Sequence, residues 1–161
     1  MIDESSSDSS LIFMMGEFEA VFPTDRLYAK NHMWAQPVAG GETDQFRFGF
    51  TAYAVRLLQD VYFLDWLIDA PSVLKTNQEI GSIESKKAES ALFAPAAGEL
   101  TQFNESLMED PSAINTDKYG EGWLLDVKIQ QPEFLTPEQY IELLDEVWAK
   151  TQRTIKGQLN E

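Results

Sequence analysis

Apolar and polar side chains alternate through the middle of the chain, a pattern typical of half-buried β-strands. The run QFRFGF at 45–50 shows this most clearly, because Phe46, Phe48 and Phe50 share one face of the expected strand. Residues 32–38 predict the strand before it, with Gly40 and Gly41 in the intervening turn. The same criteria predict further strands at 61–66, 80–83, 91–94, 99–103 and 123–129.

Two helices are predicted from capping residues and apolar spacing. Thr51 is placed to cap a short helix that runs to Leu58. Near the C-terminus, Thr136 with Pro137 and Gln139 has the composition of a capping box with proline at the first helical position. The residues that follow form one apolar stripe: Ile141, Leu144, Val147 and Trp148. The pattern therefore predicts a mainly β protein with a C-terminal amphipathic helix.

The ends and the longest loop are less regular. Residues 1–10 are acidic and serine-rich, and we expect them to form a disordered tail. Residues 11–23 are rich in apolar side chains and fit either an added strand or a packed arm. Residues 104–122 predict a loop with one helical turn. No Pro-, Gly- or Ser-rich linker divides the rest, so 11–161 is expected to be a single domain.

Composition limits the possible partners. Twelve basic against twenty-seven acidic residues give a formal net charge of −15. Such a charge repels phosphate backbones and anionic lipids, so we expect neither nucleic acid nor a membrane as a partner. The N-terminus lacks the pattern of a signal or transit peptide, which predicts a cytoplasmic protein.

The chain also lacks the usual groups of redox and metal chemistry. It has no cysteine and a single histidine, His32. It can therefore form no disulfide, thiolate site or multi-histidine metal site of its own. We expect no metal site, no self-sufficient catalysis, and an imported group for any redox step.

The stretch IESKKAES at 83–90 places two lysines at the tip of a predicted hairpin. Two-residue hairpin turns favour Asn-Gly or glycine-rich pairs, so Lys86-Lys87 indicates a constraint other than folding. One interpretation is that the lysines balance Glu84 and Glu89, which would face each other across the strands. The other is that an exposed amine is presented to a modifying enzyme.

Several segments carry a family resemblance. The run ESKKAESALFAPAAGEL at 84–100, followed by NTDKYGEGWLLDVKI at 115–129, resembles the lipoyl-bearing H-protein of the glycine cleavage system. Upstream, YAKNHMWA at 28–35 and GFTAYA at 49–54 are similar to further elements of that family. The resemblance covers about Arg26 to Trp148, in family order, and leaves an N-terminal extension of roughly 25 residues.

The resemblance implies a fold and a set of site residues. The fold would be the lipoyl/biotinyl-type barrel-sandwich hybrid of short antiparallel strands. Lys87 falls on the lipoylated lysine, Glu84 and Gly98 fall on positions read by the lipoyl-attaching enzyme, and His32 lies near the cavity that receives the loaded arm. The chain departs from the family pattern at three positions: Gln59 replaces a glycine, Lys86 an aliphatic residue and Ala97 a serine.

The resemblance also implies a cofactor and partners. Lipoate attached to Lys87 would supply the dithiol states that the chain lacks. The protein would be a non-catalytic carrier of an aminomethyl group and reducing equivalents between glycine decarboxylase (pyridoxal-phosphate), aminomethyltransferase (tetrahydrofolate) and dihydrolipoyl dehydrogenase. A lipoate ligase or lipoyltransferase would attach the group, and the carrier would be a monomer with weak, electrostatically steered contacts.

Related alternatives differ in cofactor or pathway. Biotinyl domains share the fold but place their lysine between two methionines, and the lipoyl domains of 2-oxo acid dehydrogenases are shorter and lack the Tyr119–Trp123 loop. A lipoyl carrier for another route, such as lipoate relay or sulfur oxidation, remains open. So does an interaction module that is not lipoylated.

Overall fold

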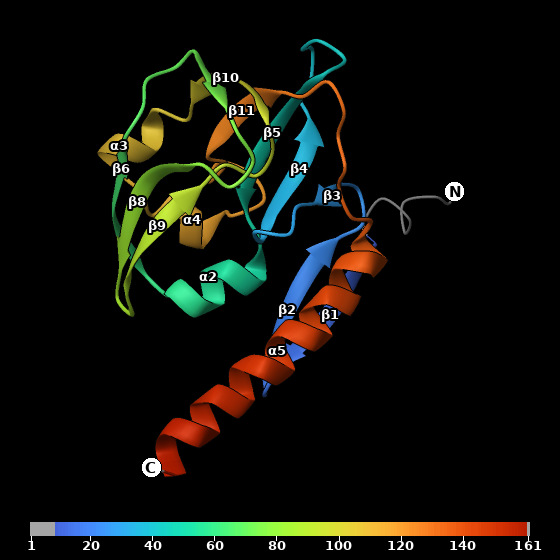
Figure 1. The fold of residues 1–161 in the computed structure, drawn as a ribbon, viewed down its shortest axis with the longest axis vertical. Coiled ribbons are helices and arrows are strands. Elements are labelled where there is room, and N and C mark those ends of the chain that lie inside the picture. Colours follow the sequence, from blue (N-terminus) through green and yellow to red (C-terminus); the bar gives the residue numbers. More distant parts are fainter. Residues whose placement is uncertain (1–8, 161) are drawn as a thin grey trace.

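The computed structural model describes residues 9–160, with side chains as far as residue 152. Its strands form three antiparallel sheets, and a long C-terminal helix lies along one side (Figure 1). The strands are β1 Ser10–Met15, β2 Phe18–Pro23, β3 Leu27–Tyr28, β4 Met33–Pro37, β5 Gln45–Phe50, β6 Val61–Trp66, β7 Ser72–Leu74, β8 Glu79–Ser85, β9 Glu89–Phe93, β10 Gly98–Phe103 and β11 Leu125–Lys128. The helices are α2 Ala52–Leu58, α3 Ser106–Glu109, α4 Ala113–Thr116 and α5 Pro137–Asn160.

Two of the sheets enclose the main core. The larger has the order β3-β4-β5-β11-β10-β7, and the smaller has the order β6-β8-β9. Inward-facing apolar side chains from both sheets fill the space between them, with Phe48, Ile80 and Leu100 fully buried. The mainly β, antiparallel fold with a C-terminal helix is therefore confirmed.

Strand β5 shows how the alternating sequence becomes two faces. Phe48 and Phe50 lie in the main core, and Phe46 packs against it. On the other face, Arg47 donates to the buried carboxylate of Asp126 over 2.9 Å. The two-residue period thus separates the apolar side chains from the polar ones, as predicted.

A second apolar cluster lies under α5. It is formed by Phe13, Met15, Ala20, Phe22, Tyr28, Trp34, Ala52, Tyr53, Tyr140 and Leu144. Strand β4 joins the two clusters, because Met33 and Ala35 face the main core while Trp34 faces the second. One strand therefore fixes the position of α5 relative to the sheets.

Helix α5 begins as its sequence predicts. The Thr136 hydroxyl accepts from the Gln139 amide over 3.1 Å, and the Thr136 amide donates to the Gln139 side chain over 3.0 Å. This reciprocal capping box satisfies donors that an uncapped first turn leaves free. The apolar stripe then packs into the second cluster, where Tyr140 and Leu144 are fully buried.

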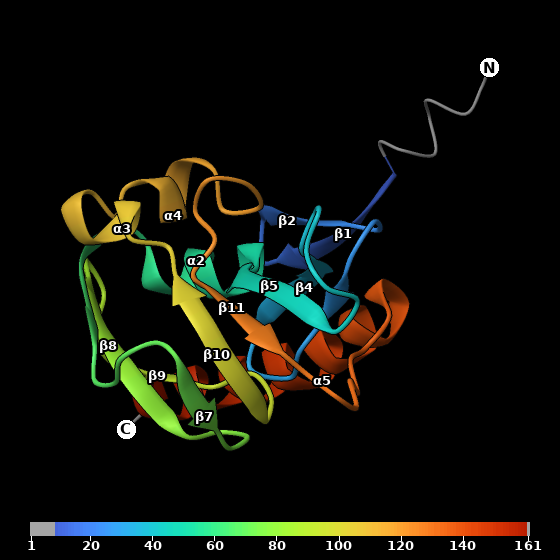
Figure 2. The same cartoon turned by 90° about the horizontal axis from the view of Figure 1, so that it is seen from above.

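The N-terminal segment is a hairpin of its own. Strands β1 and β2 pair from Ser10↔Pro23 to Met15↔Phe18, and Gly16 makes the turn with a φ of 67°. One face of this hairpin packs beneath α5, and Figure 2 shows it beside β4 and β5. The apolar segment 11–23 is thus two strands rather than one arm.

Three other details differ from the sequence-based expectations. The tail predicted at 1–10 is ordered at its end: Ser10 belongs to β1, and the Ser9 carbonyl accepts from the Thr24 amide, because the pairing with β2 extends that far. The rest of the predicted tail, residues 1–8, lies outside the described residues. His32 precedes its strand, in a turn with a φ of 69°. Residues 104–122 contain two helical turns, α3 and α4.

Within residues 9–160, no helix has the length and apolar character needed to cross a membrane.

Candidate functional site

The two lysines occupy the turn between β8 and β9. Glu84 pairs with Glu89, as the sequence predicted, and the Ser85 amide donates to the Ala88 carbonyl over 2.9 Å. The Ser85 hydroxyl adds two further bonds, donating to the Ala88 carbonyl and accepting from the Ala88 amide. Side-chain bonds of this kind brace a turn whose central residues are not those that such turns prefer.

The two lysines differ in their backbone hydrogen bonds. The Lys86 amide donates to the Asp60 carbonyl over 2.8 Å, which ties Lys86 to the start of β6. Lys87 makes no hydrogen bond among the described residues, and its side chain is exposed. Both amines are exposed, and the two residues differ in that only the backbone of Lys86 is tethered.

Neither lysine forms an ion pair. The three ion pairs within 4.0 Å in the described part of the chain involve other cations, namely Arg26, Arg47 and Lys128. Glu84 and Glu89 are exposed to solvent. The interpretation that the lysines are there to pair with the glutamates therefore gains no support from contacts.

Glu84 and Gly98 lie in different surroundings. Glu84 is next to the turn on β8, whereas Gly98 opens β10 in the other sheet, beyond the five residues of β9. Five strand residues span about 17 Å. A Cβ at position 98 would clash with the Lys128 carbonyl oxygen, so the close approach of β10 to β11 requires glycine there. The fold itself thus gives a reason for Gly98.

His32 is partly buried beside two tyrosine rings. Its Nδ1 is 2.9 Å from the Tyr140 hydroxyl, and its ring lies 4.7 Å from that of Tyr53. The Tyr140 hydroxyl is also 2.9 Å from the Thr51 hydroxyl, so α5, α2 and the β3–β4 turn meet at this point. Burial lowers the pKa of His32 to about 4, which leaves the imidazole neutral near pH 7.

Asn31, next to His32, reaches the lysine hairpin. Its side-chain amide donates to the Phe93 carbonyl on β9 over 3.0 Å. Its Oδ1 is buried and has no hydrogen-bond partner within the described residues. A buried acceptor without a donor is costly, and such atoms often mark a place where a ligand binds.

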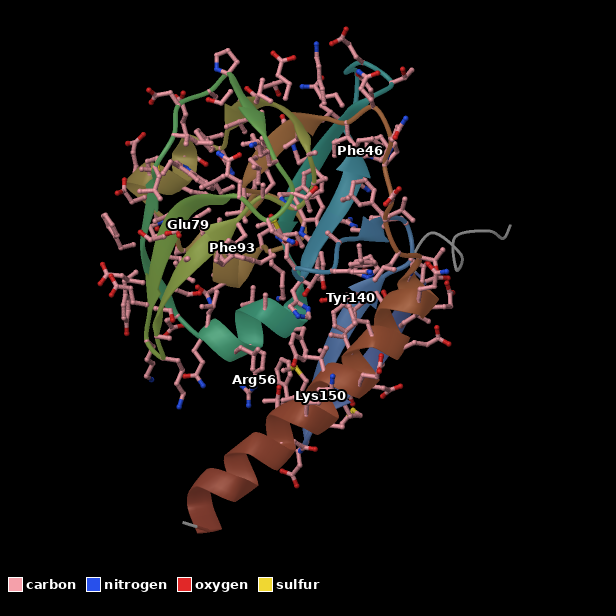
Figure 3. The ribbon with its side chains drawn as sticks, in the orientation of Figure 1. Phe46, Arg56, Glu79, Phe93, Tyr140 and Lys150 are labelled. Atoms are coloured by element: carbon pink, nitrogen blue, oxygen red, sulfur yellow. The ribbon has the colours of Figure 1, made fainter. Side chains whose placement is uncertain are left out.

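A cavity of about 630 Å³ opens beside Asn31. Its walls include Lys30 and three short segments: residues 95–98, 129–131 and 133–134. The base of the lysine hairpin lies beside this cavity. Phe93 and Glu79 pair there, and Figure 3 shows them together, away from the turn. His32 does not line this cavity, because its ring faces Tyr140 and Tyr53 instead.

Helix α2 links the surroundings of His32 to the lysine turn. The His32 carbonyl accepts from Thr51, the N-cap residue, and the Asp60 carbonyl just beyond the C-cap accepts from Lys86. The seven residues of α2 span about 10 Å. His32 and the turn are therefore joined through α2, its two caps and a hydrogen bond at each end.

The Tyr119–Trp123 loop is structural. The Tyr119 hydroxyl accepts from the Ala52 amide over 2.9 Å and donates to the Val21 carbonyl over 2.8 Å. It thus joins the N-terminal hairpin to α2. Trp34 is buried and Trp123 lies under Arg47, so both tryptophans have the packing roles expected of large rings.

Sequence reasoning did not identify Asn31 as a site residue. Its only signal was its place directly before His32 in the element YAKNHMWA. The contact with Phe93 joins residues 62 positions apart, and no local pattern encodes such a pair.

Comparison with known proteins gives a consistent result. The family model "Glycine cleavage H-protein" matches residues 26–147. A glycine cleavage system H protein from Rubrobacter xylanophilus is 41% identical over 128 residues, covering 79% of this chain and 98% of the relative. One from Methylacidiphilum infernorum is 40% identical over 131 residues, covering 77% and 96%.

A solved structure agrees with these sequences. The crystal structure of a glycine cleavage system H protein from Mycobacterium marinum matches with a TM-score of 0.65 and 34% identity. The match covers 78% of this chain and 98% of that one. The β1–β2 hairpin precedes the segment matched by the family model.

Proposed function

This chain belongs to the glycine cleavage H-protein family, a family of non-catalytic lipoyl carriers, and from that membership we propose that Lys87 is its lipoylated residue. The observation that carries the proposal is the difference between the two lysines. Both side chains are exposed at the tip of a braced turn, but the Lys86 backbone is tied to Asp60, whereas the Lys87 backbone makes no hydrogen bond among the described residues. An amine must enter the active site of an acylating enzyme, and Lys87 is the one placed to do so.

Lipoate in amide linkage to Lys87 would supply the disulfide and dithiol states that a chain without cysteine cannot form. Glu84, one strand residue before the turn, is positioned for contact with the attaching enzyme. Gly98 would contribute to recognition through the shape of the strand pair behind the hairpin.

The surroundings of His32 fit a resting place for the loaded arm. A lysine side chain joined to lipoate spans roughly 13 Å at about 1.2 Å per bond, so it can extend along α2 from the turn. Asn31 lies farther off, because its side chain binds the Phe93 carbonyl at the end of β9 away from the turn. Neutral His32 adds no charge that would repel an aminomethyl cargo. Shelter from water would protect such a labile group.

As a carrier of the glycine cleavage system, the chain works with that system's enzymes. We assign to it glycine decarboxylase, aminomethyltransferase and dihydrolipoyl dehydrogenase as partners, with a lipoate ligase or lipoyltransferase for attachment. The net charge of −15 favours weak, steered encounters and disfavours self-association, which fits a monomer.

The site assignment is tested by co-expression with a lipoate ligase, followed by peptide mass mapping of two variants. We expect Lys86→Ala to be lipoylated and Lys87→Ala to remain unmodified, because among the described residues the Lys86 backbone is tied to Asp60 and the Lys87 backbone makes no hydrogen bond. Modification that survives in Lys87→Ala and disappears in Lys86→Ala would reverse the assignment. The intact mass of protein from its native host distinguishes a carrier from an unlipoylated interaction module.

A further inference from the structure

Two aromatic side chains are exposed on the strand that flanks the lysine hairpin. Tyr62 is 62% exposed and Phe63 is 50% exposed, both on β6. Strand β6 is the edge of the three-stranded sheet, directly beside β8. Two adjacent exposed rings form an apolar patch, and apolar patches rimmed by polar residues often mark interaction sites.

A β-bulge causes the exposure. The pairing of β6 with β8 shifts between Val61 and Phe63, so Tyr62 is an extra residue in the ladder. Val61 and Leu64 are buried, and in a regular strand Phe63 would share a face with Val61. The bulge turns Phe63 outward, which is a known use of bulges near functional sites.

The bulge is held rigidly. The Asn115 side chain accepts from the Val61 amide over 2.9 Å and donates to the Gln59 carbonyl over 2.7 Å. The Lys86 amide binds the Asp60 carbonyl immediately before the strand. The aromatic pair and the lysine turn are therefore fixed relative to each other.

The pair lies close to Lys87. Phe63 is the cross-strand partner of Glu84, and neighbouring strands are about 4.8 Å apart. Glu84 is three residues from Lys87, at most about 10 Å along the chain, so the rings and the lysine turn lie at the same end of the sheet. Exposed carboxylates surround them at Asp60, Asp65, Glu84 and Glu89.

We propose that Tyr62 and Phe63 form, with this acidic rim, the docking surface for the enzyme that acylates Lys87. The inference rests on the proposed lipoylation of Lys87. Acyl transfer requires the Lys87 Nζ to reach the activated acyl carbon, so the acylating enzyme must cover the residues around the turn. The partners of the finished arm act at its far end, roughly 13 Å away, and can leave this surface uncovered.

The chemistry of the partner follows from that of the surface. Two exposed rings fit an apolar hollow, and four carboxylates fit a rim of lysine and arginine. The docked enzyme would contact β6 and the turn at the same time, because the contacts of Asn115 and Lys86 fix the position of β6 relative to the turn. Binding at the rings would then bring the lysine turn to the active site.

The test compares lipoylation kinetics of full-length variants by a purified lipoate ligase with ATP and lipoate. We expect Tyr62→Ser/Phe63→Ser to raise the KM for the acceptor protein about tenfold with kcat within twofold. Tyr62→Lys should have a similar effect, because it places a cation against the lysine and arginine side chains expected on the enzyme. Tyr62 is exposed, so the change removes no buried group. Phe93→Ser is the matched control, since Phe93 is 42% exposed at the opposite end of the hairpin.

The outcomes separate this inference from the proposed function. Wild-type protein that is not modified at Lys87 would refute the proposed site. Wild-type protein that is modified, with an unchanged KM in both aromatic variants, would overturn only the docking surface. Equal losses in Phe93→Ser would also overturn it. Once the variants are lipoylated, NADH and dihydrolipoyl dehydrogenase should reduce their lipoyl groups at the wild-type rate. A slower reduction together with unchanged lipoylation kinetics would assign the surface to a later partner instead.

Discussion

At the scale of single residues, Gln59 occupies a conformation that suits glycine. It ends α2 with a φ of 61° and a ψ of −143°, a region that side chains bearing a Cβ rarely adopt. The family resemblance places a glycine at this position. The departure seen in the sequence is therefore a point of backbone strain next to the residue that tethers the lysine turn.

Replacing Gln59 with glycine should stabilise the fold. Relief of the strain outweighs the greater chain entropy of glycine when unfolded, so we expect Gln59→Gly to raise the free energy of unfolding by about 1 kcal/mol. Urea denaturation measures the change. Gln59→Ala is the control, because it removes the same side chain but keeps the Cβ. A gain in Gln59→Ala equal to that in Gln59→Gly would show that the side chain, not the backbone, is responsible.

At the scale of elements, the N-terminal hairpin completes the cluster that holds α5 and His32. Phe22 is fully buried and meets the rings of Tyr28 and Tyr140 edge to face, at 6.2 and 5.4 Å between centroids. Tyr140 in turn hydrogen-bonds His32. The hairpin, which precedes the family-matched segment, thus supports a residue of the proposed arm site.

Truncating Phe22 should therefore cost much of the stability. We expect Phe22→Ala to lower the free energy of unfolding by about 3–5 kcal/mol, because it leaves a cavity beside the rings of Tyr28 and Tyr140. Chemical denaturation provides the measurement. Val21→Ala on the outer face of the same strand should cost under about 1 kcal/mol. Similar losses in the two variants would mean that the hairpin is stabilised by its pairing and not by its packing beneath α5.

At the scale of the whole molecule, the acidic charge should govern encounter rates. With a net charge of −15, association with a cationic enzyme surface is accelerated at low salt and screened at high salt. We expect kcat/KM for reduction of the lipoylated protein by dihydrolipoyl dehydrogenase to fall at least about threefold from 0.01 to 0.3 M salt. Free lipoamide, which is uncharged, is the control and should show no comparable change. A rate that rises with salt would contradict steering by opposite charge.

Much of this protein follows from local sequence. The two-residue period of QFRFGF set the two faces of β5, and the Thr136–Gln139 capping box set the start of α5. The register that places Glu84 opposite Glu89 followed from the lysine turn. These features depend on neighbouring residues whose backbone angles and hydrogen bonds are decided within a few positions.

Only the tertiary structure decided the rest, because it depends on pairs that are distant in the chain. The residues 11–23 form a hairpin under α5, and Asn31 meets Phe93, through contacts that no local period encodes. Gly98 lies away from Lys87 because β9 intervenes, although the sequence suggested a shared role. The outward turn of Phe63 required a bulge, which is set by how β6 meets β8 and the Asn115 side chain. The sequence by itself determined that two lysines occupy a hairpin turn, and packing decided that the Lys86 backbone is tied to Asp60 and that Phe63 faces outward beside the turn.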